Sequence, residues 1–467
     1  SNTLRVRVSL RPPKNMKIKN YISKNYSNYL QSKSSIIYPR NKKDIVKAIN
    51  FAKKNKLKIL SLGSSLSWFD TIFNTNNVVI NLNKYKKTFK FDRQNGSLIL
   101  SPSYRISEII KLINKFGWTI CSIPGNSEVT IGGCIGNDVH GKDSFKYGNF
   151  GENVEEFEII TADKKIVKCT KSKNKELFRS VVGGLGLLGI VINIKLKLKR
   201  TSKNYITSNY ICRNYNEIVK EIYYKKENYE YIYGWLDTHA KKKSLGRGII
   251  FKSKKNNLFK NFNKKKNFFD QFKIFLQKII FSISIKNDLI KYLNYFYFKS
   301  FSFKKHNYLS QYNDIAYPLE ANGIDVKSQI TPQAFFEIQV IIKKRNLPIG
   351  LKLFLEKCHK LDLYSIITGI KIHKKSKNFL SFADDGISIN IVKVITKKNF
   401  KKTKTQFQEL HKFAVSKNYK VYICKDFFLD QKSLEKNYKL SKNFLLFKKK
   451  YDPKSLFYSD FLKRVKK

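Results

Sequence analysis

The stretch that most constrains the fold is GGLGLLGIVINI, residues 183–194, because Gly184–Gly189 fits the G-x-G-x-x-G pattern of dinucleotide-binding loops. In a Rossmann fold this pattern follows a strand, opens a helix and precedes an acidic residue by about 20 positions. Here the preceding KELFRSVV resembles the end of a helix, and residues 192–198 alternate apolar with lysine or asparagine. No acidic residue occurs between Gly189 and Glu217. The sequence therefore predicts a glycine turn that leads into a strand, and it argues against a Rossmann site.

A denser glycine run lies upstream, SIPGNSEVTIGGCIGNDVHGK at residues 122–142, with five glycines in 21 residues. Backbone that approaches a pyrophosphate closely needs glycine, because a Cβ atom would block access to the amides. A second Gly/Ser turn, LGSSLSWFD at residues 62–70, ends an apolar strand. Taken singly, each stretch is also compatible with a purely structural loop. Together they predict a phosphate-containing cofactor held by two loops.

The charge of the chain is extreme, with a formal net charge of +59 from 93 basic and 34 acidic residues. Arginine, the preferred reader of bases and phosphates, accounts for only 12 of the basic residues, and lysines occur throughout the chain. We interpret most of the charge as solvated surface and a smaller part as attraction to an anionic membrane or lipid. A basic nucleic-acid-binding protein is disfavoured, because no arginine–aromatic patch or recognisable module is found.

The six cysteines contain no C-x-x-C pair, which suits a reducing compartment and predicts no metal site. No signal peptide is visible, and no run of about 18 uncharged apolar residues could span a bilayer. We therefore expect a cytoplasmic protein, with peripheral contact to the inner face of a membrane as a further expectation.

The length of 467 residues predicts more than one domain. Helical spacing occurs in residues 44–54 and 105–116, and FEIITADKKIVKCT predicts a hairpin with its turn at 162–165. After residue 201 the glycines thin out and tyrosine and lysine dominate. We expect a first domain at 1–201, a second domain at 202–430, and a C-terminal segment at 431–467 that packs back on the first domain.

These stretches resemble the FAD-linked oxidases of the vanillyl-alcohol oxidase / p-cresol methylhydroxylase superfamily. The resemblance rests on YPRNKKDIVKAINFAKKNKLKI, the Ser/Gly turn, the PG…TIGG…G…HG run and GGLGLLGI. Within the superfamily, IGNDVHGKDSFKYGNFGENV, GWLD, the KD at 425–426 and DPKSLFYSDFLKR are similar to the decaprenylphosphoryl-β-D-ribose 2-oxidases. The resemblance implies an α+β fold: a two-subdomain FAD-binding domain of the p-cresol methylhydroxylase type, plus a substrate (cap) domain built on an antiparallel sheet with helices.

The resemblance also implies which residues contact FAD. The first turn reads Ser-Ser-Leu-Ser-Trp where several family members tether FAD through histidine, so we expect non-covalent FAD. The implied cofactor-binding residues are Ser61, Gly63, Ser64, Ser65, Leu66, Ser67, Trp68, Gly125, Thr130, Ile131, Gly132, Gly133, Asn137, Asp138, Val139, His140, Ile190 and Tyr422.

Flavin-dependent oxidation of a secondary alcohol needs a hydride acceptor and a group that removes the hydroxyl proton near neutral pH. His140 follows the glycine run and matches the family's HGK motif, while Lys425 matches the family's active-site lysine. We predict both as catalytic, against the alternatives of a structural histidine and a solvated lysine. The substrate-binding residues implied by the resemblance are Lys142, Trp235, Lys371 and Asn390.

The function implied is oxidation of a sugar hydroxyl, at C2 of a polyprenylphosphoryl pentose, by hydride transfer to flavin N5. A separate short-chain reductase would complete an epimerisation used in the cell envelope. A soluble aldonolactone or polyol oxidase of the same superfamily is the alternative, because the family's Gln-x-Gln pair has no clear match near Asp325–Gln329.

The segment at residues 267–285 has Phe and Ile near helical spacing, after a lysine cluster at 254–266. A basic amphipathic helix can lie on an anionic membrane. A core-facing helix and a lid over the site are the alternatives, and all three stay open at this point.

Overall fold

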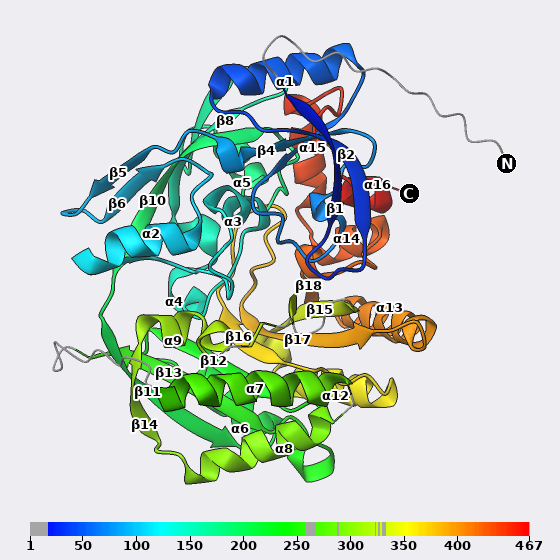
Figure 1. Ribbon diagram of the computed structural model, residues 1–467. Helices are drawn as coiled ribbons and strands as arrows, with labels where there is room; N and C mark the ends of the chain where they lie inside the picture. The colour runs from blue at the N-terminus through cyan, green and yellow to red at the C-terminus, as the bar shows by residue number, and fades with distance from the viewer. Residues whose placement is uncertain are drawn as a thin grey trace.

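We describe a computed structural model of the chain, which covers residues 17–256, 268–286, 289–322, 324–325, 327–328 and 333–466. Three β-sheets organise these residues (Figure 1), the first two in the upper half of the view and the third in the lower half. The expected lysine cluster at 254–266 lies largely outside the described residues.

The first sheet has four strands in the order β1-β2-β4-β3, with β2, β4 and β3 parallel to one another. Helix α1 covers it, because Ile45, Ala48 and Ile49 form one buried helical face. The side chain of Asn41 caps this helix by accepting a hydrogen bond from the amide of Asp44. The strands are β1 (Ile18–Lys24), β2 (Gln31–Ile37), β3 (Ile59–Leu62) and β4 (Val78–Asn81).

The second sheet is antiparallel and has six strands, in the order β5-β6-β10-β8-β9 with β7 also paired to β10. Its long strand β10 begins at Ile190, directly after the glycine turn, and alternates between buried and partly exposed residues over most of its length. The strands are β5 (Phe89–Asp92), β6 (Ser97–Leu100), β7 (Trp118–Ile120), β8 (Val154–Ile160), β9 (Ile166–Thr170) and β10 (Ile190–Arg200).

The third sheet has eight antiparallel strands in the order β14-β11-β13-β12-β16-β17-β15-β18. Helix α13 packs against β15, β17 and β18, so one face of these strands is an apolar core. The strands are β11 (Asn204–Cys212), β12 (Tyr231–Leu236), β13 (Gly248–Lys255), β14 (Asn307–Gln311), β15 (Ala334–Lys343), β16 (Gly369–His373), β17 (Gly386–Ile395) and β18 (Lys420–Val421).

Helices connect and cover these sheets (Figure 1). Their bounds are α1 (Lys42–Lys54), α2 (Ile106–Ile113), α3 (Ile131–Asn137), α4 (Ser144–Tyr147), α5 (Lys175–Val181), α6 (Tyr215–Val219), α7 (Phe268–Lys286), α8 (Ile290–Ser300), α9 (Tyr312–Ala316), α10 (Pro318–Ala321), α12 (Ile349–Lys360), α13 (Phe400–Ser416), α14 (Gln431–Asn437), α15 (Ser441–Tyr451) and α16 (Asp460–Val465).

The elements predicted from local patterns are confirmed. Helix α5 ends just before the glycines of residues 183–189 and strand β10 follows them, so the Rossmann interpretation fails as expected. The predicted hairpin is formed by β8 and β9, and the helix predicted at 105–116 is α2 with a 3₁₀ extension to Phe116. The helix predicted at 267–285 is α7.

The C-terminal segment returns to the first sheet. The amide of Tyr458 donates to the carbonyl of Ile59, and the Arg464 guanidinium binds both carboxylate oxygens of Asp70 at 2.7 and 3.1 Å. A planar guanidinium paired with both oxygens fixes orientation as well as distance. This contact holds the turn after β3, which the next section places at the pocket.

Candidate active site

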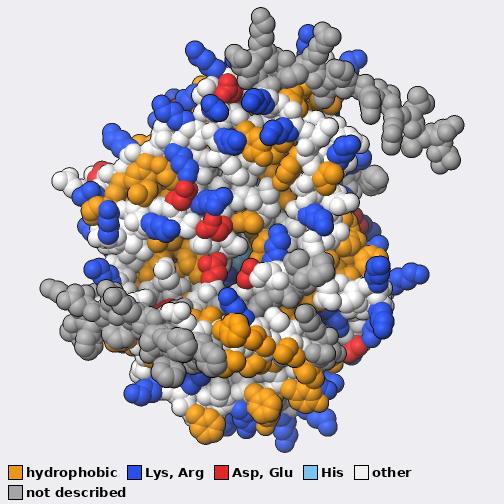
Figure 2. All heavy atoms as spheres, viewed as in Figure 1, with side chains coloured by type: hydrophobic (Ala, Val, Ile, Leu, Met, Phe, Trp, Pro, Cys, Tyr) orange, Lys and Arg blue, Asp and Glu red, His pale blue; other side chains and the backbone are white. Residues whose placement is uncertain are grey.

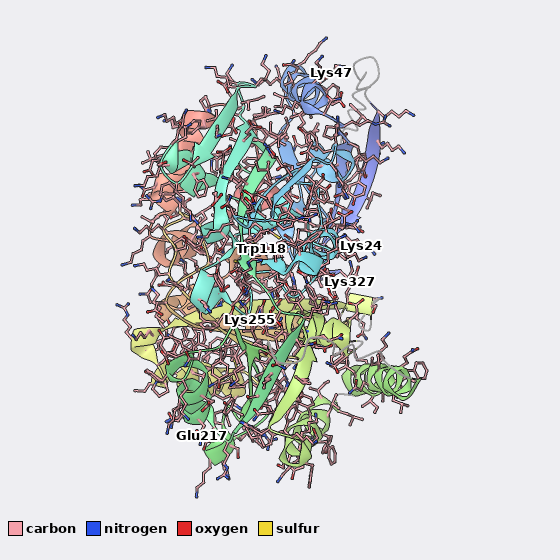
Figure 3. All side chains as sticks on the ribbon, turned by 90° about the vertical axis from the view of Figure 1, so that its left-hand side faces the viewer. Lys24, Lys47, Trp118, Glu217, Lys255 and Lys327 are labelled. Atoms are coloured by element: carbon pink, nitrogen blue, oxygen red, sulfur yellow. The ribbon has the colours of Figure 1, made fainter. Side chains whose placement is uncertain are left out.

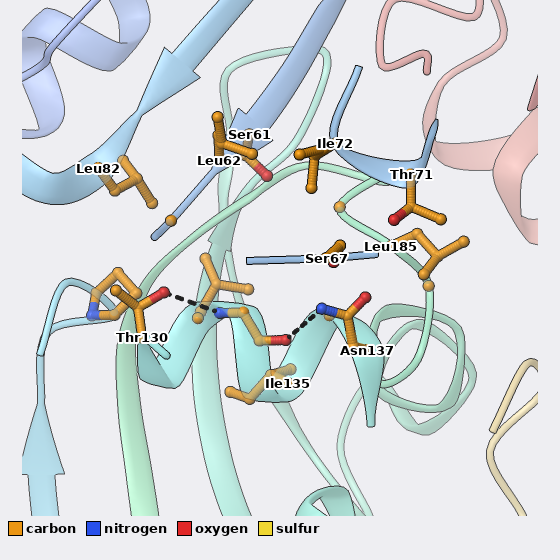
Figure 4. Close-up of a pocket in the computed structure, with 18 of the residues that line it drawn as sticks. Ser61, Leu62, Ser67, Thr71, Ile72, Leu82, Thr130, Ile135, Asn137 and Leu185 are labelled. Carbon is orange, nitrogen blue, oxygen red and sulfur yellow. Dashed lines mark hydrogen bonds between the residues drawn. The ribbon is translucent and has the colours of Figure 1, made fainter. Parts of the chain in front are cut away.

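A pocket lies where three segments of the chain meet (Figure 4), and all the residues that line it lie between residues 61 and 191. Residues 61–67 are the end of β3 and the turn after it, residues 129–139 contain α3, and residues 184–191 are the glycine turn and the start of β10. The two glycine-rich stretches and the Ser/Gly turn found in the sequence therefore converge on one cavity. Other residues that line it are Thr71, Ile72, Leu82, Pro102, Ile159 and Val181.

Glycine is required at two positions in this pocket. A Cβ atom on Gly63 would lie 2.0 Å from the Oγ1 atom of Thr130, the residue that caps α3. Gly186 has a φ of +71°, and a Cβ there would lie 2.7 Å from the Oγ atom of Ser61. L-residues rarely adopt such a φ, and both sites are too close for a side chain. The three loops can therefore approach one another only because these positions lack a side chain.

Of the 28 residues that line the pocket, none carries a charged side chain. The hydroxyl of Thr71 is buried without a hydrogen-bond partner, and no hydrogen bond within the described chain uses the amides of residues 65–67. In contrast, the amides of Ile131 and Gly132 in α3 already donate to the carbonyls of Tyr104 and Pro102. The donors left for a pyrophosphate are thus neutral amides and hydroxyls of the serine loop, a set that fits FAD.

Most of the cofactor-binding residues expected from the resemblance line this pocket. The dashed lines in Figure 4 mark hydrogen bonds within α3 and its N-cap: the amide of Gly133 donates to the hydroxyl of Thr130, and the side-chain amide of Asn137 donates to the carbonyl of Gly133 at 3.0 Å. The expected residues that line the pocket are Ser61, Gly63, Ser64, Ser65, Leu66, Ser67, Thr130, Gly132, Gly133, Asn137 and Val139.

The remaining expected cofactor residues lie beside the pocket rather than in its lining. The carboxylate of Asp138 accepts hydrogen bonds from the amide of Gly151 and the hydroxyl of Ser381, so it ties the loop after α3 to the second half of the chain. Ile190 points into the core next to β8, while its neighbours Gly189 and Val191 line the pocket. Ile131 is buried in the core, whereas Gly125 is exposed and is not one of the residues that line the pocket.

A cluster of polar side chains lies next to this pocket, on one face of the third sheet. Directly paired residues of antiparallel strands share a face, and so do residues two apart on one strand. Register therefore places Gln339 of β15, Asn390 and Ser388 of β17, and Lys371 of β16 on the same face. The two-residue spacing adds Glu337 and His373. The opposite face of these strands packs its apolar side chains against α13, so the polar side chains of this face are not part of that core.

His140 meets this face three residues after the end of α3. Its Nε2 atom lies 3.4 Å from Oε1 of Gln339, and its ring contacts the ring of His373 at 4.7 Å between centroids. Its Nδ1 atom is buried and has no hydrogen-bond partner within the described chain. Burial, and next the ammonium of Lys371, lower the pKa of His140 well below its ordinary value. The ring is therefore neutral near pH 7 and can accept a proton.

Lys425 reaches the same cluster from the short 3₁₀ turn after β18. Its Nζ atom lies 3.0 Å from Oε1 of Glu337 and 4.7 Å from the ring centroid of Trp68. Burial raises the pKa of Glu337, and the Lys425 ammonium opposes that rise. The second oxygen of Glu337, Oε2, is buried and makes no hydrogen bond to the described chain. Trp68, expected at the cofactor, thus packs on the lysine of this cluster.

Two more lysines carry perturbed pKa values here. Burial and the Lys425 ammonium lower the pKa of Lys371 to about 8. Burial, and then Lys371, lower the pKa of Lys142 well below its usual range, and the Lys142 Nζ atom donates to the carbonyl of Ala316 at 2.6 Å. Perturbed pKa values cluster at functional sites. Trp235, on β12 beside β16, contacts the ring of Tyr297 at 4.8 Å.

Asn137 joins the cluster to the pocket. It lines the pocket, its carbonyl accepts a hydrogen bond from the hydroxyl of Tyr422 at 3.1 Å, and its Oδ1 atom accepts one from the Cys424 thiol at 2.9 Å. His140 follows it by three residues, and Lys425 follows Cys424 directly. The predicted catalytic pair therefore lies at one end of the glycine-lined pocket.

The sequence analysis missed four members of the cluster: Glu337, Gln339, His373 and Ser388. The sequence analysis found no clear match to a Gln-x-Gln pair near Asp325–Gln329, whereas Glu337 and Gln339, which have the same spacing, lie in the cluster. The available signal was the strand AFFEIQVIIK, in which two polar residues two apart interrupt a fully buried apolar run.

Comparisons with known proteins agree with this geometry. Residues 34–170 match the FAD binding domain family. The chain is 26% identical to the decaprenylphosphoryl-beta-D-ribose oxidase of Mycolicibacterium smegmatis over 221 residues. The aligned residues are 46% of this chain and 48% of that protein. Residues 34–170 thus form an FAD binding domain of the kind found in the vanillyl-alcohol oxidase / p-cresol methylhydroxylase superfamily of FAD-linked oxidoreductases.

Other curated proteins align with the chain over shorter stretches. The human delta(24)-sterol reductase is 28% identical over 132 residues, 26% of each chain. The bovine L-gulonolactone oxidase is 23% identical over 159 residues, which is 34% of this chain and 36% of that protein. The chain thus aligns with about half or less of the length of the curated relatives it matches. FAD is the cofactor of this chain, and the residues that line the pocket described above fit FAD.

Proposed function

We propose that this FAD-dependent oxidoreductase oxidises a secondary hydroxyl of a sugar, at C2 of a polyprenylphosphoryl pentose. The observation that carries the proposal is the cluster of a neutral His140, three lysines and one buried carboxylate at the end of the FAD pocket. Amide, hydroxyl and carboxylate groups hydrogen-bond to sugar hydroxyls, and ammonium groups pair with phosphates. When bound, the flavin supplies the acceptor for the hydride that leaves the carbon.

Different side chains of the cluster would remove the proton and position the substrate. With the Nε2 proton of His140 donated to Gln339, the Nδ1 atom carries a lone pair that can accept the hydroxyl proton. Glu337 orients the Lys425 ammonium, which in turn can hold the substrate oxygen in place. Lys371 and Lys142 add positive charge for a phosphate, and Asn390 and Trp235 lie along the same face. The keto product would pass to a short-chain reductase that completes an epimerisation.

An aldonolactone or other polyol oxidase is the second candidate. It is favoured by the similarity to L-gulonolactone oxidase and to a putative D-arabinono-1,4-lactone oxidase of Neurospora crassa. A lactone carries no phosphate, so it would supply no counter-ion for Lys142 and Lys371, whose ammonium forms burial disfavours. We therefore favour the phosphorylated substrate.

Two structural proposals accompany this function. The lining of the pocket contains no histidine, cysteine or tyrosine, so no side chain there could be tethered to FAD, and we propose that FAD is held non-covalently. We also propose that the first two sheets are the two subdomains of an FAD-binding domain at 1–201. The third sheet would then be the substrate domain at 202–430, with 431–467 packed back on the first.

The location in the cell follows from the same reasoning. In the described residues no helix is long and apolar enough to cross a membrane. We propose a cytoplasmic protein with peripheral contact to the inner membrane face, where a polyprenyl substrate would reside.

Anaerobic titration of the yellow protein tests the substrate. A polyprenylphosphoryl pentose should bleach the flavin absorbance, whereas free aldonolactones should leave it unchanged. Bleaching by lactones alone would establish the alternative. The variant His140→Gln should bind FAD normally but reduce it about 100-fold more slowly. His359→Gln, at a half-buried histidine whose Nε2 atom hydrogen-bonds the carbonyl of Ala240, is the matched control and should keep the native rate.

A further inference from the structure

Helices α7 and α8 expose a large apolar surface. They lie in front of the third sheet in Figure 1, and Figure 3 shows them standing out from the body of the molecule when the view is turned by 90°. Figure 2 shows an orange area over this part of the molecule. We call this the α7–α8 surface; its exposed members are Phe275, Leu276, Ile279, Ile280, Ile283, Leu289, Tyr292, Tyr295, Phe296, Tyr297 and Phe303.

Packing against the described part of the chain leaves these side chains exposed. Helix α7 already buries Phe281, while Phe275, Ile279 and Ile283, four residues apart, form a stripe on an exposed side. Phe303, in the turn after α8, is 91% exposed. Contiguous exposed apolar patches of this kind mark interaction sites in soluble proteins. The α7–α8 surface therefore needs a partner with an apolar face.

The charges next to the α7–α8 surface identify that partner. Residues 251–310 contain fourteen lysines, two aspartates, and no glutamate or arginine. Lys278, Lys291, Lys299 and Lys305 are exposed on or beside the two helices. A second copy of the chain would bring the same lysines face to face, whereas an anionic bilayer offers phosphates at the level where its acyl chains begin. Long lysine stems can lie along apolar surface while their ammonium groups reach the headgroups.

The α7–α8 surface also lies over the polar cluster. Tyr297 of α8 contacts Trp235, and Ile285 near the end of α7 packs in one cluster with Trp68 and Phe335. Trp68 is the ring under Lys425. The two helices are thus connected by direct packing to the residues around the candidate catalytic lysine.

We propose that the α7–α8 surface docks the enzyme on an anionic lipid bilayer, with both helices parallel to the membrane. The apolar stripe enters the boundary between headgroups and acyl chains, and the lysines contact lipid phosphates. Docking in this orientation would hold the polar cluster near the membrane, where a lipid-linked substrate could reach it. That last consequence rests on the proposed function, whereas the docking itself does not.

Co-sedimentation of the FAD-loaded full chain with vesicles tests the docking without any substrate. The probe is phosphatidylcholine vesicles with phosphatidylglycerol, compared with phosphatidylcholine alone. The test variants are Phe296→Asp and Phe303→Asp, at positions 67% and 91% exposed, and the matched control is Leu446→Asp, 66% exposed on α15. We expect binding to the anionic vesicles, about tenfold or more weaker partition for the test variants, and native partition for the control. Native flavin absorbance in every variant shows that the fold is kept.

Three results would overturn the proposal. The first is no sedimentation of the native protein with anionic vesicles. The second is equal loss of binding in the test and control variants, which would mean that lysines spread over the surface bind the vesicles. The third is self-association of the native protein that the test variants abolish, which would assign the α7–α8 surface to a second copy. Failure of the sugar-lipid assay with vesicle binding intact would overturn the proposed substrate and leave the docking standing.

Discussion

Replacement of Glu337 by glutamine tests the polar cluster most sharply. The Glu337 side chain is fully buried and pairs with Lys425 at 3.0 Å, while the Lys425 side chain is 23% exposed. At an effective dielectric constant of about 20, two unit charges at this distance attract by about 5 kcal/mol. The desolvation of the buried carboxylate offsets most of that attraction. Because water can still reach Lys425, we expect Glu337→Gln to lower the free energy of unfolding by about 1–2 kcal/mol.

The effect on catalysis should be larger than the effect on stability. Glu337 raises the pKa of Lys371, which is about 8, so loss of the carboxylate should lower that pKa further. A lysine whose folded pKa falls loses its ammonium at lower pH, and the basic limb of the kcat/KM profile should move to lower pH. Glu221→Gln is the matched control, because Glu221 pairs with the buried Lys252 at 2.6 Å on the far side of the third sheet. It should cost similar stability and leave the pH profile unchanged.

The assay is the rate of flavin bleaching in stopped flow from about pH 6 to about pH 10, a range of about two units on each side of the pKa of Lys371. Thermal unfolding of both variants is measured in parallel. A profile for Glu337→Gln that superimposes on the native profile, with the stability loss present, would refute the role assigned to the carboxylate. It would make the Glu337–Lys425 pair structural.

Two further predictions concern the pocket and the loop that carries Lys425. Gly63→Ala should weaken FAD binding about tenfold or more, measured by flavin fluorescence, because its Cβ would displace the Thr130 hydroxyl; native affinity would contradict the tight approach of the two loops. Asp426→Asn removes the carboxylate that hydrogen-bonds Nδ1 of the buried His411 at 2.9 Å. The pKa of His411 is raised in the folded state, so the pair stabilises the fold below about pH 6.5, and this stabilisation is lost as the pH rises through the folded pKa of His411. The pKa of Asp426 is lowered, so the contribution of its carboxylate is lost only when the pH falls through the folded pKa of Asp426. The loss of unfolding free energy in Asp426→Asn should therefore be about 1 kcal/mol larger near pH 5 than near pH 9, and equal losses at both would contradict the charged pair.

Local patterns were sufficient to predict the elements around the FAD pocket. The glycine turn was assigned correctly because the helix before it and the alternating strand after it are adjacent in the sequence and both are visible as local patterns. Helices α1 and α2 follow from apolar spacing alone. In such cases the residues that decide the structure are neighbours in the sequence.

The polar cluster could not be assembled in the same way. Glu337 and Gln339 sit in a strand that is buried on both faces, so no alternation marks which face is polar. Their partners, Lys425 and His140, are 88 and 199 residues away. Asp138 shows the same limit: the resemblance implies that it lies at the cofactor, but no local pattern indicated that its carboxylate accepts hydrogen bonds from Gly151 and Ser381. Side chains that meet through long-range register carry no local signal.

The central claim is that the three converging loops hold FAD without a covalent bond. The most direct measurement is the visible absorption spectrum of the purified protein after incubation with FAD, before and after acid precipitation. We predict flavin bands at about 375 and 450 nm in the protein, and transfer of all the colour to the supernatant with the precipitate colourless. A protein that stays colourless after incubation would contradict FAD binding, and colour retained in the precipitate would contradict the non-covalent pocket.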